Sequence, residues 1–276
     1  MSVQLPDIRV LKYYSKCSII ELMASSLPDK EFLGTLAKGL SVITVFDEKT
    51  PVLTVTAAAA AIGVSRATAR RILHTLHQLG YVEQNGRSFS LAPKALDLGY
   101  RYLSSQSWIE RAGMLLKVLS EEIGESASAA VLQGTEIVYV AHVPSRRLLS
   151  VDETIGTHLP AFHTALGRVQ LGYLKGADLW ARLKSVRHSS YTSSTIINMQ
   201  GLYDRIQSDR DQGFAIIDEE LEKGLRSLAV PVLGRDDNLL GAISISVNAT
   251  RTTRDYLRTV YLPKLRAVAV NITDGT

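Results

Sequence analysis

The sequence predicts an α+β protein: an N-terminal winged helix-turn-helix, a linker helix, and a C-terminal antiparallel sheet flanked by helices. Three observations predict this fold class. Two short helical patterns, separated by a glycine turn, precede two short alternating runs around Asn85-Gly86. Farther on, strand-like and helical segments mix without the regular alternation that predicts a doubly wound parallel sheet. The excess positive charge is confined to the helix-turn-helix segment.

The composition is that of an ordinary globular protein, because 46% of the 276 residues are hydrophobic and 21% are charged. The length favours two domains. No run approaches the ~18 apolar residues that span a bilayer, and the charged N-terminus is unlike a secretory signal. Cys17 is the only cysteine, which excludes an internal disulfide and a CxxC-type metal site. We therefore expect a cytoplasmic protein without a membrane partner, a metal or a cofactor.

The first predicted domain covers residues 28–92, after an apolar leader at 1–27 whose structure the sequence does not predict. Apolar residues at three- and four-residue spacing predict a helix over Lys30–Phe46. Thr54 is a good N-cap for a second, alanine-rich helix that ends at Ile62. Alanine favours helix and has little bulk, so a neighbouring helix can approach this one closely.

The third helix begins after the turn at Gly63-Val64, with Ser65 as its N-cap, and Gly80 ends it. At 100° per residue, its apolar side chains fall within one arc of roughly 120°. These are Ala69, Ile72, Leu73, Leu76 and Leu79. The opposite arc holds Ala67, Arg70, Arg71, His74 and Gln78. The hairpin that follows has its turn at Asn85-Gly86 and supplies the wing.

The segment from Gly63 to Lys94 holds five basic residues and one acidic residue, which leaves 26 of each sign in the rest of the chain. A localised basic patch is typical of a phosphate-binding surface. On the outer arc, Arg70, Arg71 and His74 can bond base edges in a DNA major groove. Ser65, Arg66 and Thr68 can hold phosphate at the helix start, and Arg87 can do so on the wing. The alternative is a solvated basic face without a partner.

A linker helix is predicted over residues 93–107, because Pro93 opens a helical pattern that stops in a serine-rich run. The second predicted domain, 108–276, begins with a helix over Trp108–Ile123. Its predicted strands are Ala127–Leu132, Ile137–Val143, Leu148–Val151, Phe214–Ile217, Leu225–Leu233 and Leu239–Val247. Its remaining predicted helices are Thr164–Leu174, Leu179–Val186, Leu202–Gln212 and Arg254–Ile272.

Three segments of this second domain could build a ligand site. Thr164 can cap a helix whose first N–H groups, on Ala165 and Leu166, suit a carboxylate; the alternative is an ordinary capped helix. The acidic run from Asp218 to Ser227 could equally be a solvated turn. Ser244 and Ser246 lie on one face of a strand, where they either line a cavity or are ordinary strand serines.

Signatures of enzymes are sparse, since GxSxG, GxGxxG and GxxxxGK[ST] are all absent. His158 and His163 lie near each other in the sequence but have no cysteine ligand beside them. A hydrolase triad can be assembled on paper from Ser227, His163 and Asp218, although no spacing favours it. An enzyme acting on a small carboxylic acid, with an accessory DNA-binding module, therefore stays as the alternative function.

From about Lys30 onward the chain resembles the IclR family of bacterial transcription regulators. The matching blocks are EFLGTLAKGLSVITVF, FSLAPKALDLGYRYL, GTHLPAFHTALGRVQLGYL and GFAIIDEELEKGLRSLAVPV with GAISISV. The forms GLRSLAVPV and VPSRRLLSV are most similar to the branch that controls aromatic-acid breakdown through the β-ketoadipate pathway, with protocatechuate or 4-hydroxybenzoate as typical compounds.

The resemblance implies a dimerising winged helix-turn-helix, a GAF-like effector domain, a small organic acid as effector, and dimers or tetramers on double-stranded operator DNA. Carried over by motif, the effector-binding positions are Ala165, Leu166, Asp218, Ser227, Ser244 and Ser246. We add Arg146 or Arg147 as the counter-ion of an aromatic carboxylate, because a guanidinium fork fits a carboxylate.

Two positions depart from the family pattern. Ser227 stands where many members have cysteine, which leaves a hydrogen-bond donor but removes the bulk of a thiol. Ala57 stands where an acidic residue often completes a capping box. The expected function is a ligand-responsive transcription regulator without enzymatic activity. A sequence-independent DNA-packaging protein is a third alternative, which the electrical neutrality of the remaining chain disfavours.

Overall fold

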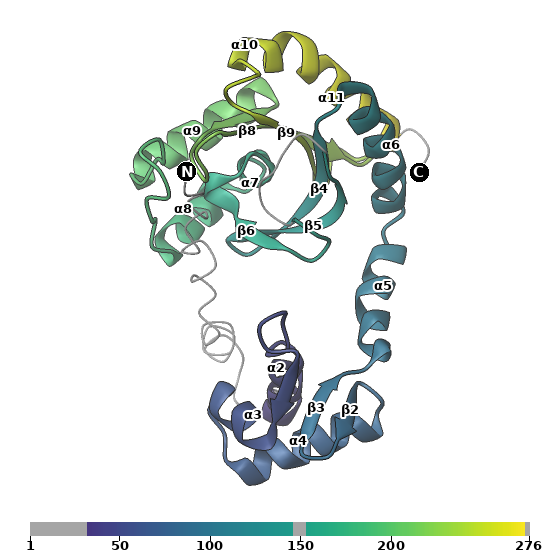
Figure 1. The fold of residues 1–276 in the computed structure, drawn as a ribbon. Coiled ribbons are helices and arrows are strands. Elements are labelled where there is room, and N and C mark those ends of the chain that lie inside the picture. Colours follow the sequence, from purple (N-terminus) through teal and green to yellow (C-terminus); the bar gives the residue numbers. More distant parts are fainter. Residues whose placement is uncertain (1–31, 146–152, 274–276) are drawn as a thin grey trace, which may run out of the picture. The chain divides into compact units, whose positions relative to one another are not determined.

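The computed structural model describes residues 32–145 and 153–273 (Figure 1). The predictions for the leader 1–27, for Cys17, for the strand Leu148–Val151 and for Arg146 and Arg147 therefore fall outside the described residues. The chain divides into two compact units between Arg101 and Tyr102. Each unit is described by itself below.

The N-terminal unit is a winged helix-turn-helix. Its helices are α2 (Gly34–Ile43), α3 (Val55–Ala61) and α4 (Arg66–Gln78), and its strands are β1 (Val52–Thr54), β2 (Val82–Asn85) and β3 (Ser88–Leu91). The strands form an antiparallel sheet in the order β1-β3-β2. The predicted hairpin is thus confirmed. The third strand of the sheet, β1, was not predicted. Its three residues are too few to show an alternating pattern, and the strand is defined by its pairing with β3.

The local signals that predicted the helix-turn-helix act as expected. The Thr54 hydroxyl accepts a hydrogen bond from the Ala57 N–H at 3.2 Å, and Ser65 accepts one from Thr68 at 3.1 Å. Gly63 has a φ of +64°, which side-chain-bearing residues rarely adopt. The caps and the turn therefore fix where α3 ends and α4 begins.

The apolar arc of α4 packs against α2, α3 and the wing. Its buried members are Ala69, Ile72, Leu73 and Leu76, joined in the core by residues such as Val42 and Phe89. Leu79 is an exception, with 52% of its surface exposed. Leu79 is the C-cap of α4, and its N–H still bonds to the carbonyl oxygen of Thr75 at 2.9 Å, so it lies at the end of the apolar arc, where its side chain is left exposed.

The segment after the wing forms a 3-10 turn and then two helices. These are η2 (Pro93–Ala95), α5 (Leu96–Ser104) and α6 (Ser107–Ile123). No side chain of α5 is buried, as befits a segment between two units. Gly124, with a φ of +72°, ends α6 in the left-handed conformation.

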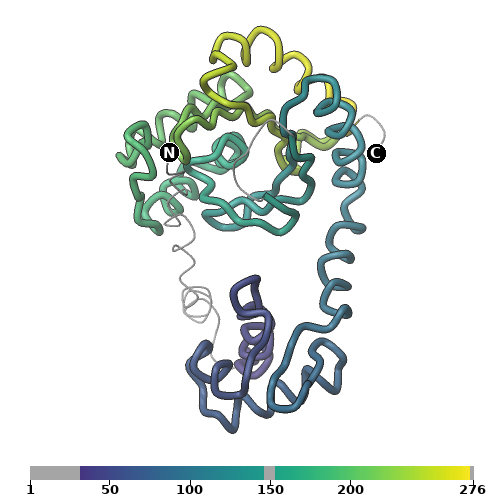
Figure 2. The backbone as a smooth tube through the Cα atoms, viewed as in Figure 1, coloured from purple at the N-terminus to yellow at the C-terminus, as the bar shows by residue number. Residues whose placement is uncertain are grey.

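The C-terminal unit is built on a six-stranded antiparallel sheet in the order β6-β5-β4-β9-β8-β7. Strands β4 and β9 are hydrogen-bonded neighbours although Ser126 and Ser246, which pair across them, are far apart in the sequence (Figure 2). The strands are β4 (Ser126–Gln133), β5 (Glu136–Val143), β6 (His158–Pro160), β7 (Ala215–Asp218), β8 (Leu225–Leu233) and β9 (Leu239–Asn248).

Helices cover both faces of this sheet (Figure 1). One face packs on α6 and the C-terminal helices, and the other packs on α7, α8 and α9. The remaining elements are η3 (Ala161–His163), α7 (Ala165–Leu171), α8 (Gly176–Ser185), α9 (Met199–Gln212), α10 (Arg254–Tyr256), the π-turn η4 (Leu257–Tyr261) and α11 (Leu262–Thr273). The predicted antiparallel sheet flanked by helices is confirmed.

The alternation of side chains along β9 separates the two cores. Ile243, Ile245 and Val247 point into the α6–α11 core, whereas Ala242 lies in the α7 core. Since strand side chains alternate, Ser244 and Ser246 share the face of Ala242. This face is made of small residues, and α7 lies close against it. Contact is also close at Gly167, where an added Cβ would lie 2.1 Å from the carbonyl oxygen of Ala161.

Candidate functional site

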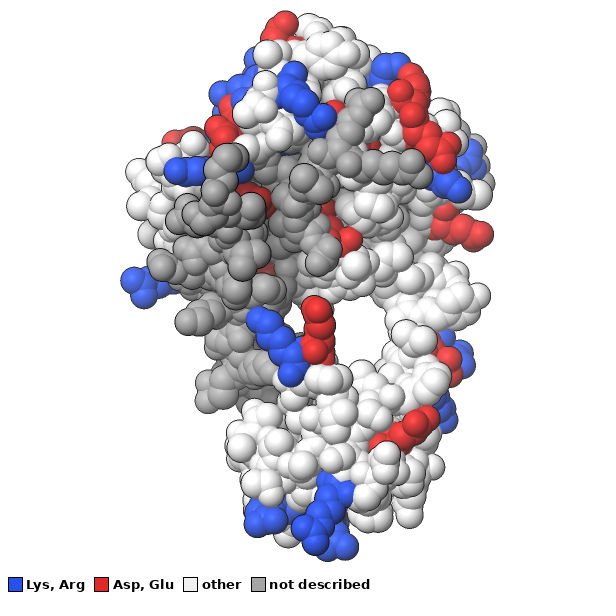
Figure 3. Space-filling view, in the orientation of Figure 1, with Lys and Arg blue, Asp and Glu red and all other residues white. Residues whose placement is uncertain are grey.

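The outer face of α4 is a row of exposed basic side chains. Arg66, Arg70, Arg71 and His74 are exposed, and Arg87 is exposed at the turn between β2 and β3. Among the described residues none of these arginines has a carboxylate partner. Figure 3 shows basic side chains gathered over the end of the N-terminal unit that α4 forms. The predicted base-reading residues are thus accessible on α4, and Arg87 is accessible on the wing.

The start of α4 is held by a local hydrogen-bond pair. The hydroxyls of Ser65 and Thr68 lie 2.9 Å apart, in addition to the capping bond from the Thr68 N–H to Ser65. Ser65 is exposed and Thr68 is half-buried. The two hydroxyls therefore order the start of α4.

Lys94, which belongs to the basic segment in the sequence, has an internal partner. Its Nζ donates to the carbonyl oxygen of Leu79 at 2.8 Å and lies 5.3 Å from the ring centre of Tyr81. A cation at a helix C-terminus satisfies a carbonyl that the helix leaves open. Lys94 therefore ties η2 to the end of α4, and the exposed charge of α4 and the wing comes from the arginines.

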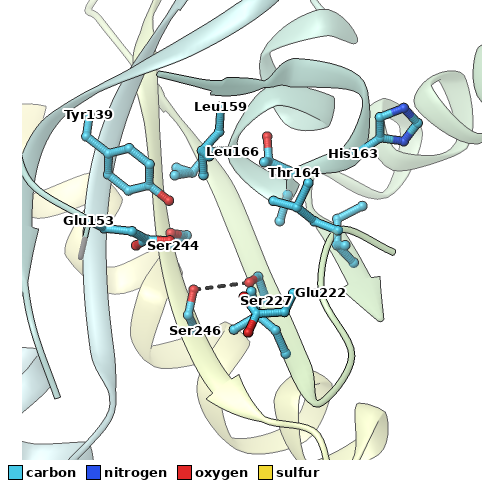
Figure 4. Close-up of a pocket in the computed structure, with 14 residues that line it drawn as sticks. Tyr139, Glu153, Leu159, His163, Thr164, Leu166, Glu222, Ser227, Ser244 and Ser246 are labelled. Atoms are coloured by element: carbon cyan, nitrogen blue, oxygen red, sulfur yellow. Dashed lines mark hydrogen bonds between the residues drawn. The ribbon is translucent and has the colours of Figure 1, made fainter. Parts of the chain in front are cut away.

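The second candidate site is a cavity in the C-terminal unit, between the start of α7, strands β8 and β9, and the acidic loop after β7. Five of the residues predicted to bind an effector line it: Ala165, Leu166, Ser227, Ser244 and Ser246. Figure 4 shows the side chains of this wall together. Three segments that are separate in the sequence therefore meet at one place.

The serine wall of the cavity follows from strand register. Ser227 on β8 pairs directly with Ser246 on β9, and their hydroxyl oxygens lie 3.1 Å apart (Figure 4). Ser244 pairs with Ser128 on β4, whose hydroxyl lies 2.9 Å from Nδ1 of His142. The ordinary-strand alternative for Ser244 and Ser246 is thus not what the structure shows, because both face the cavity.

The start of α7 supplies hydrogen-bond donors to the same cavity. The Thr164 hydroxyl accepts a hydrogen bond from the Gly167 N–H at 3.1 Å. The N–H groups of Ala165 and Leu166 belong to the first turn, where a helix has no carbonyl partner for them. Both residues are buried and line the cavity.

Asp218 has a different place from the one that the family motif implied. It does not line the cavity. Its Oδ1 accepts from Nε of Arg226 at 2.7 Å, its cross-strand partner, and its Oδ2 lies 3.6 Å from Nε of Arg254. The carboxylate thus joins the end of the sheet to the start of α10.

The acidic run after β7 is not a solvated turn. Glu220 is buried and forms an ion pair with Arg168 of α7, which is fully buried and also donates from Nε to the carbonyl of Phe162 at 2.8 Å. Glu219 adopts a φ of +56° and accepts from the Gly224 N–H at 2.6 Å. The run is folded onto α7, and this folding brings Glu222 into the cavity wall.

Four polar residues of the wall were missed: Tyr139, Glu153, His163 and Glu222. Burial raises the pKa of Glu153 to about 7, and the charge of Glu222 adds to the rise, whereas Tyr139 opposes it. Burial also raises the pKa of Glu222. For Tyr139, burial and then the charge of Glu153 raise the pKa well above its ordinary value.

His163 lines the cavity as a neutral side chain. Burial lowers its pKa to about 3, with further lowering from the charges of Arg168 and His188. Its Nδ1 is buried and has no hydrogen-bond partner among the described residues. In Figure 4 its ring points away from the serines. The triad drawn from Ser227, His163 and Asp218 is therefore not assembled, since Asp218 lies elsewhere.

The cavity is small and acidic. Its volume is about 30 Å³, room for about two water molecules. Within residues 32–145 and 153–273, no lysine or arginine side chain lines it. The same residues contain no cluster of three or more side chains suited to a metal ion. None of the described helices combines the length and the apolar character needed to cross a membrane.

Two family models match the chain. The model of the bacterial transcriptional regulator IclR C-terminal domain matches residues 100–274, and that of the IclR helix-turn-helix domain matches residues 35–86. Among curated proteins, the Pca regulon regulatory protein of Pseudomonas putida is 38% identical over 242 residues, which are 87% of this chain and 83% of that protein.

Solved structures agree with this match. A transcriptional regulator from Rhodococcus sp. RHA1 is 41% identical and superposes with a TM-score of 0.76, covering 88% of this chain and 98% of its own. The inducer-binding domain of an Acinetobacter PobR double mutant, crystallised with 3-hydroxybenzoic acid, is 26% identical with a TM-score of 0.55. It covers 58% of this chain and 94% of its own.

Proposed function

This chain belongs to the IclR family of bacterial transcriptional regulators, and from that membership we propose that it binds operator DNA under the control of a small aromatic acid. The genes under its control are those of aromatic-compound breakdown. The similarity to the Pca regulon regulatory protein and to the PobR domain with 3-hydroxybenzoic acid supports this effector class. The protein acts in the cytoplasm, where its DNA is.

The observation that carries the proposal is the meeting of serine hydroxyls and a helix start in one buried cavity. The free N–H groups of Ala165 and Leu166 and the positive end of the α7 dipole favour a carboxylate. The hydroxyls of Ser227, Ser244 and Ser246 can donate to it or accept from a ligand hydroxyl. Arg146 and Arg147 stay as proposed counter-ions from outside the described residues.

An aromatic acid requires the cavity to open. Pockets for small molecules typically occupy about 300–1,000 Å³, far more than the 30 Å³ found here. In this structure the cavity is closed to a ligand of that size. Binding must move side chains of the wall, and this rearrangement is the event that the DNA-binding unit can sense.

On DNA, we propose that α4 enters the major groove with Arg70, Arg71 and His74 at base edges. Ser65, Arg66, Thr68 and Arg87 contact the phosphate backbone. A homodimer, alone or paired into a tetramer, would place two such helices on half-sites about 34 Å apart or at multiples of it. The apolar face of α2 supports dimerisation, because Leu33, Leu36 and Leu40 are 71%, 60% and 51% exposed.

The coupling between effector and DNA runs through the linker. The helix α5 buries no side chain completely, and its Leu103 packs against the core of the C-terminal unit. We propose that effector binding changes how the linker helices of a dimer set the spacing of the two recognition helices. A small change in spacing is enough to alter affinity, because half-site separation is fixed by the DNA helix.

The test uses fluorescence anisotropy of the intergenic DNA next to the gene, at fixed salt. If Arg70 or Arg71 reads a base, its replacement by alanine should weaken specific binding by about 1–3 kcal/mol. Arg235→Ala is the matched control, because Arg235 is an exposed arginine in the C-terminal unit. Unchanged binding in both Arg70→Ala and Arg71→Ala would show that the recognition face is wrongly assigned. Adding 4-hydroxybenzoate should shift wild-type affinity.

We propose that the protein has no catalytic activity. Ser227, His163 and Asp218 do not form a catalytic triad, because Asp218 does not line the cavity. Nδ1 of His163 has no carboxylate partner among the described residues. Incubation of the protein with a panel of aromatic acids should therefore give binding without product. Turnover that disappears in Ser227→Ala would instead support the enzyme alternative.

A further inference from the structure

One end of the cavity is lined by two carboxyl groups, those of Glu153 and Glu222, and the binding of a ligand carboxylate does not account for them. Glu153 lies five residues before the start of β6 at His158, and its side chain is only 12% exposed. Figure 4 shows its carboxyl facing the hydroxyl of Tyr139, beside Ser244. Nδ1 of His142 lies 3.7 Å from its Oε2. Glu153 is thus a buried carboxyl group that lines the cavity from the segment before β6, beside Tyr139 and His142 of β5.

A second carboxyl group, that of Glu222, lines the same cavity from the acidic loop. The two groups interact, since the charge of Glu222 is one of the causes that raise the pKa of Glu153. No described lysine or arginine lies in the wall to offset them. An ionised carboxylate only accepts hydrogen bonds. This end of the cavity is therefore unfavourable for the acid group of a ligand and favourable for its hydrogen-bond donors.

The proposed function already places the ligand carboxylate at the start of α7. We propose that Glu153 is a specificity-determining residue of the cavity, which accepts a hydrogen bond from a hydroxyl group that the ligand carries in addition to its carboxylate. The inference rests on the proposed function and names the ligand as a hydroxylated aromatic acid. Tyr139 holds Glu153 in the closed form, and the ligand hydroxyl takes the place of the tyrosine when the cavity opens.

The site discriminates against an acid without a hydroxyl group because such a ligand would leave Glu153 without a hydrogen-bond partner. If benzoate entered the opened cavity, Glu153 would lose its partner without gaining another, and a buried polar group without a partner is costly. Sites built to bond a hydroxyl reject analogues that lack it far more strongly than apolar pockets reject a change in size. We expect wild-type protein to prefer a hydroxylated acid over benzoate by about 10-fold to 100-fold.

The test is isothermal titration calorimetry of the full-length protein at pH 8 with four compounds: benzoate, 3-hydroxybenzoate, 4-hydroxybenzoate and 3,4-dihydroxybenzoate. The variants are Glu153→Leu, which removes the acceptor, and Glu153→Gln, which keeps a neutral acceptor oxygen. Glu121→Gln is the control, because Glu121 is an exposed carboxylate on α6. Operator binding and thermal unfolding verify that each variant is folded.

We expect the wild-type preference to fall to within about threefold in Glu153→Leu, to survive in part in Glu153→Gln, and to be unchanged in Glu121→Gln. Equal binding of benzoate and the hydroxylated acids by wild type would overturn the role of Glu153 and leave the proposed function intact. So would an undiminished preference in Glu153→Leu. Binding of none of the four acids would overturn the proposed effector class and the inference with it.

Discussion

The pKa of Glu153 shows the effect of burying a carboxyl group in the cavity wall. Its ordinary pKa is 4.5, and burial raises the pKa in the folded protein to about 7. Between these two values the unfolded chain has lost the proton that the folded protein still holds. The stabilisation associated with the raised pKa is therefore complete below about pH 4.5 and is lost as the pH rises through 7.

A stability measurement tests this pKa at the residue scale. Glu153→Gln removes the titration, so above pH 7 the variant should be more stable than wild type by about 1–3 kcal/mol. Near pH 4.5 the two proteins should unfold alike. Urea unfolding of the C-terminal unit at several pH values measures the difference, with Glu121→Gln as the control. A gap that stays constant with pH would contradict the shifted titration.

Single residues also mark where sequence reasoning stopped. The positions of Ser65 at a helix cap, of Arg70 on an exposed helix face and of Ser246 on the cavity face of β9 follow from spacing along one helix or strand. Glu153 carries no such signal, since its partners Tyr139 and Glu222 come from other segments and meet it only through the fold. Asp218 was assigned by motif, yet the pairing register places it opposite Arg226, and that ion pair holds it.

At the scale of elements, the close packing of α7 against η3 depends on one glycine. A Cβ on Gly167 would lie 2.1 Å from the carbonyl oxygen of Ala161 and 2.4 Å from its Cα, and both are backbone atoms that cannot yield easily. Gly167→Ala should therefore destabilise the C-terminal unit by about 1–3 kcal/mol. Thermal unfolding monitored by circular dichroism measures the loss.

A matched glycine in another helix provides the control. Gly113 lies in α6, and a Cβ added there meets no atom within 4 Å. Gly113→Ala should be neutral or stabilising by up to about 1 kcal/mol, because alanine favours helix. If both variants lose stability equally, the close approach of Gly167 to Ala161 does not explain the loss.

The ion pair between α7 and the acidic loop joins two elements of the cavity wall. Arg168 is fully buried, and its Nη1 donates to Oε1 of Glu220 at 2.9 Å. Removing one member leaves the other charge buried, which typically costs about 3–5 kcal/mol. We expect Arg168→Met and Glu220→Gln each to show such a loss in urea unfolding, and both to weaken effector binding because Glu222 moves with the loop.

The double variant separates pairing from packing. Arg168→Met combined with Glu220→Gln leaves no unpaired charge, so its loss of stability should be clearly smaller than the sum of the two single losses. Strict additivity of the three free energies of unfolding would show that the two side chains act independently. The same set of proteins, titrated with 4-hydroxybenzoate, reports whether the loop positions the cavity wall.

Elements differ in how far the sequence predicts them. The helices α3 and α4 and the wing hairpin are defined by local caps, periodicity and a turn, so their prediction held. The strand β1 and the serine wall of the cavity depend on pairing between segments that are distant in the sequence. Strand register fixes that pairing: Ser227 meets Ser246 only because β8 and β9 align as they do.

At the scale of the whole molecule, the charge distribution predicts how DNA binding depends on salt. Arg66, Arg70, Arg71 and Arg87 are exposed and have no carboxylate partner among the described residues, whereas Lys94 is tied to Leu79. Each phosphate contact contributes about 0.9 to the slope of log K against log salt concentration. If Arg66 contacts a phosphate in each protomer of a dimer, Arg66→Ala should lower the slope by about 2.

Titrations at several salt concentrations measure this slope by anisotropy. The specificity for operator over unrelated DNA should change little in Arg66→Ala, because a phosphate contact carries no sequence information. Arg70→Ala should instead relax specificity. An unchanged slope in Arg66→Ala would place that arginine away from the DNA backbone, and the same slope in Lys94→Ala as in wild type would agree with its internal role.

The alternation along β9 has a consequence for how such a sensor can diversify. Its odd-numbered residues Ile243 and Ile245 lie in one core, whereas the alternating residues Ser244 and Ser246 face the cavity. A change of chemistry on the second set therefore leaves the first set in place. New ligand preferences can accumulate on this strand by point substitution without the molecule having to find a new way to fold.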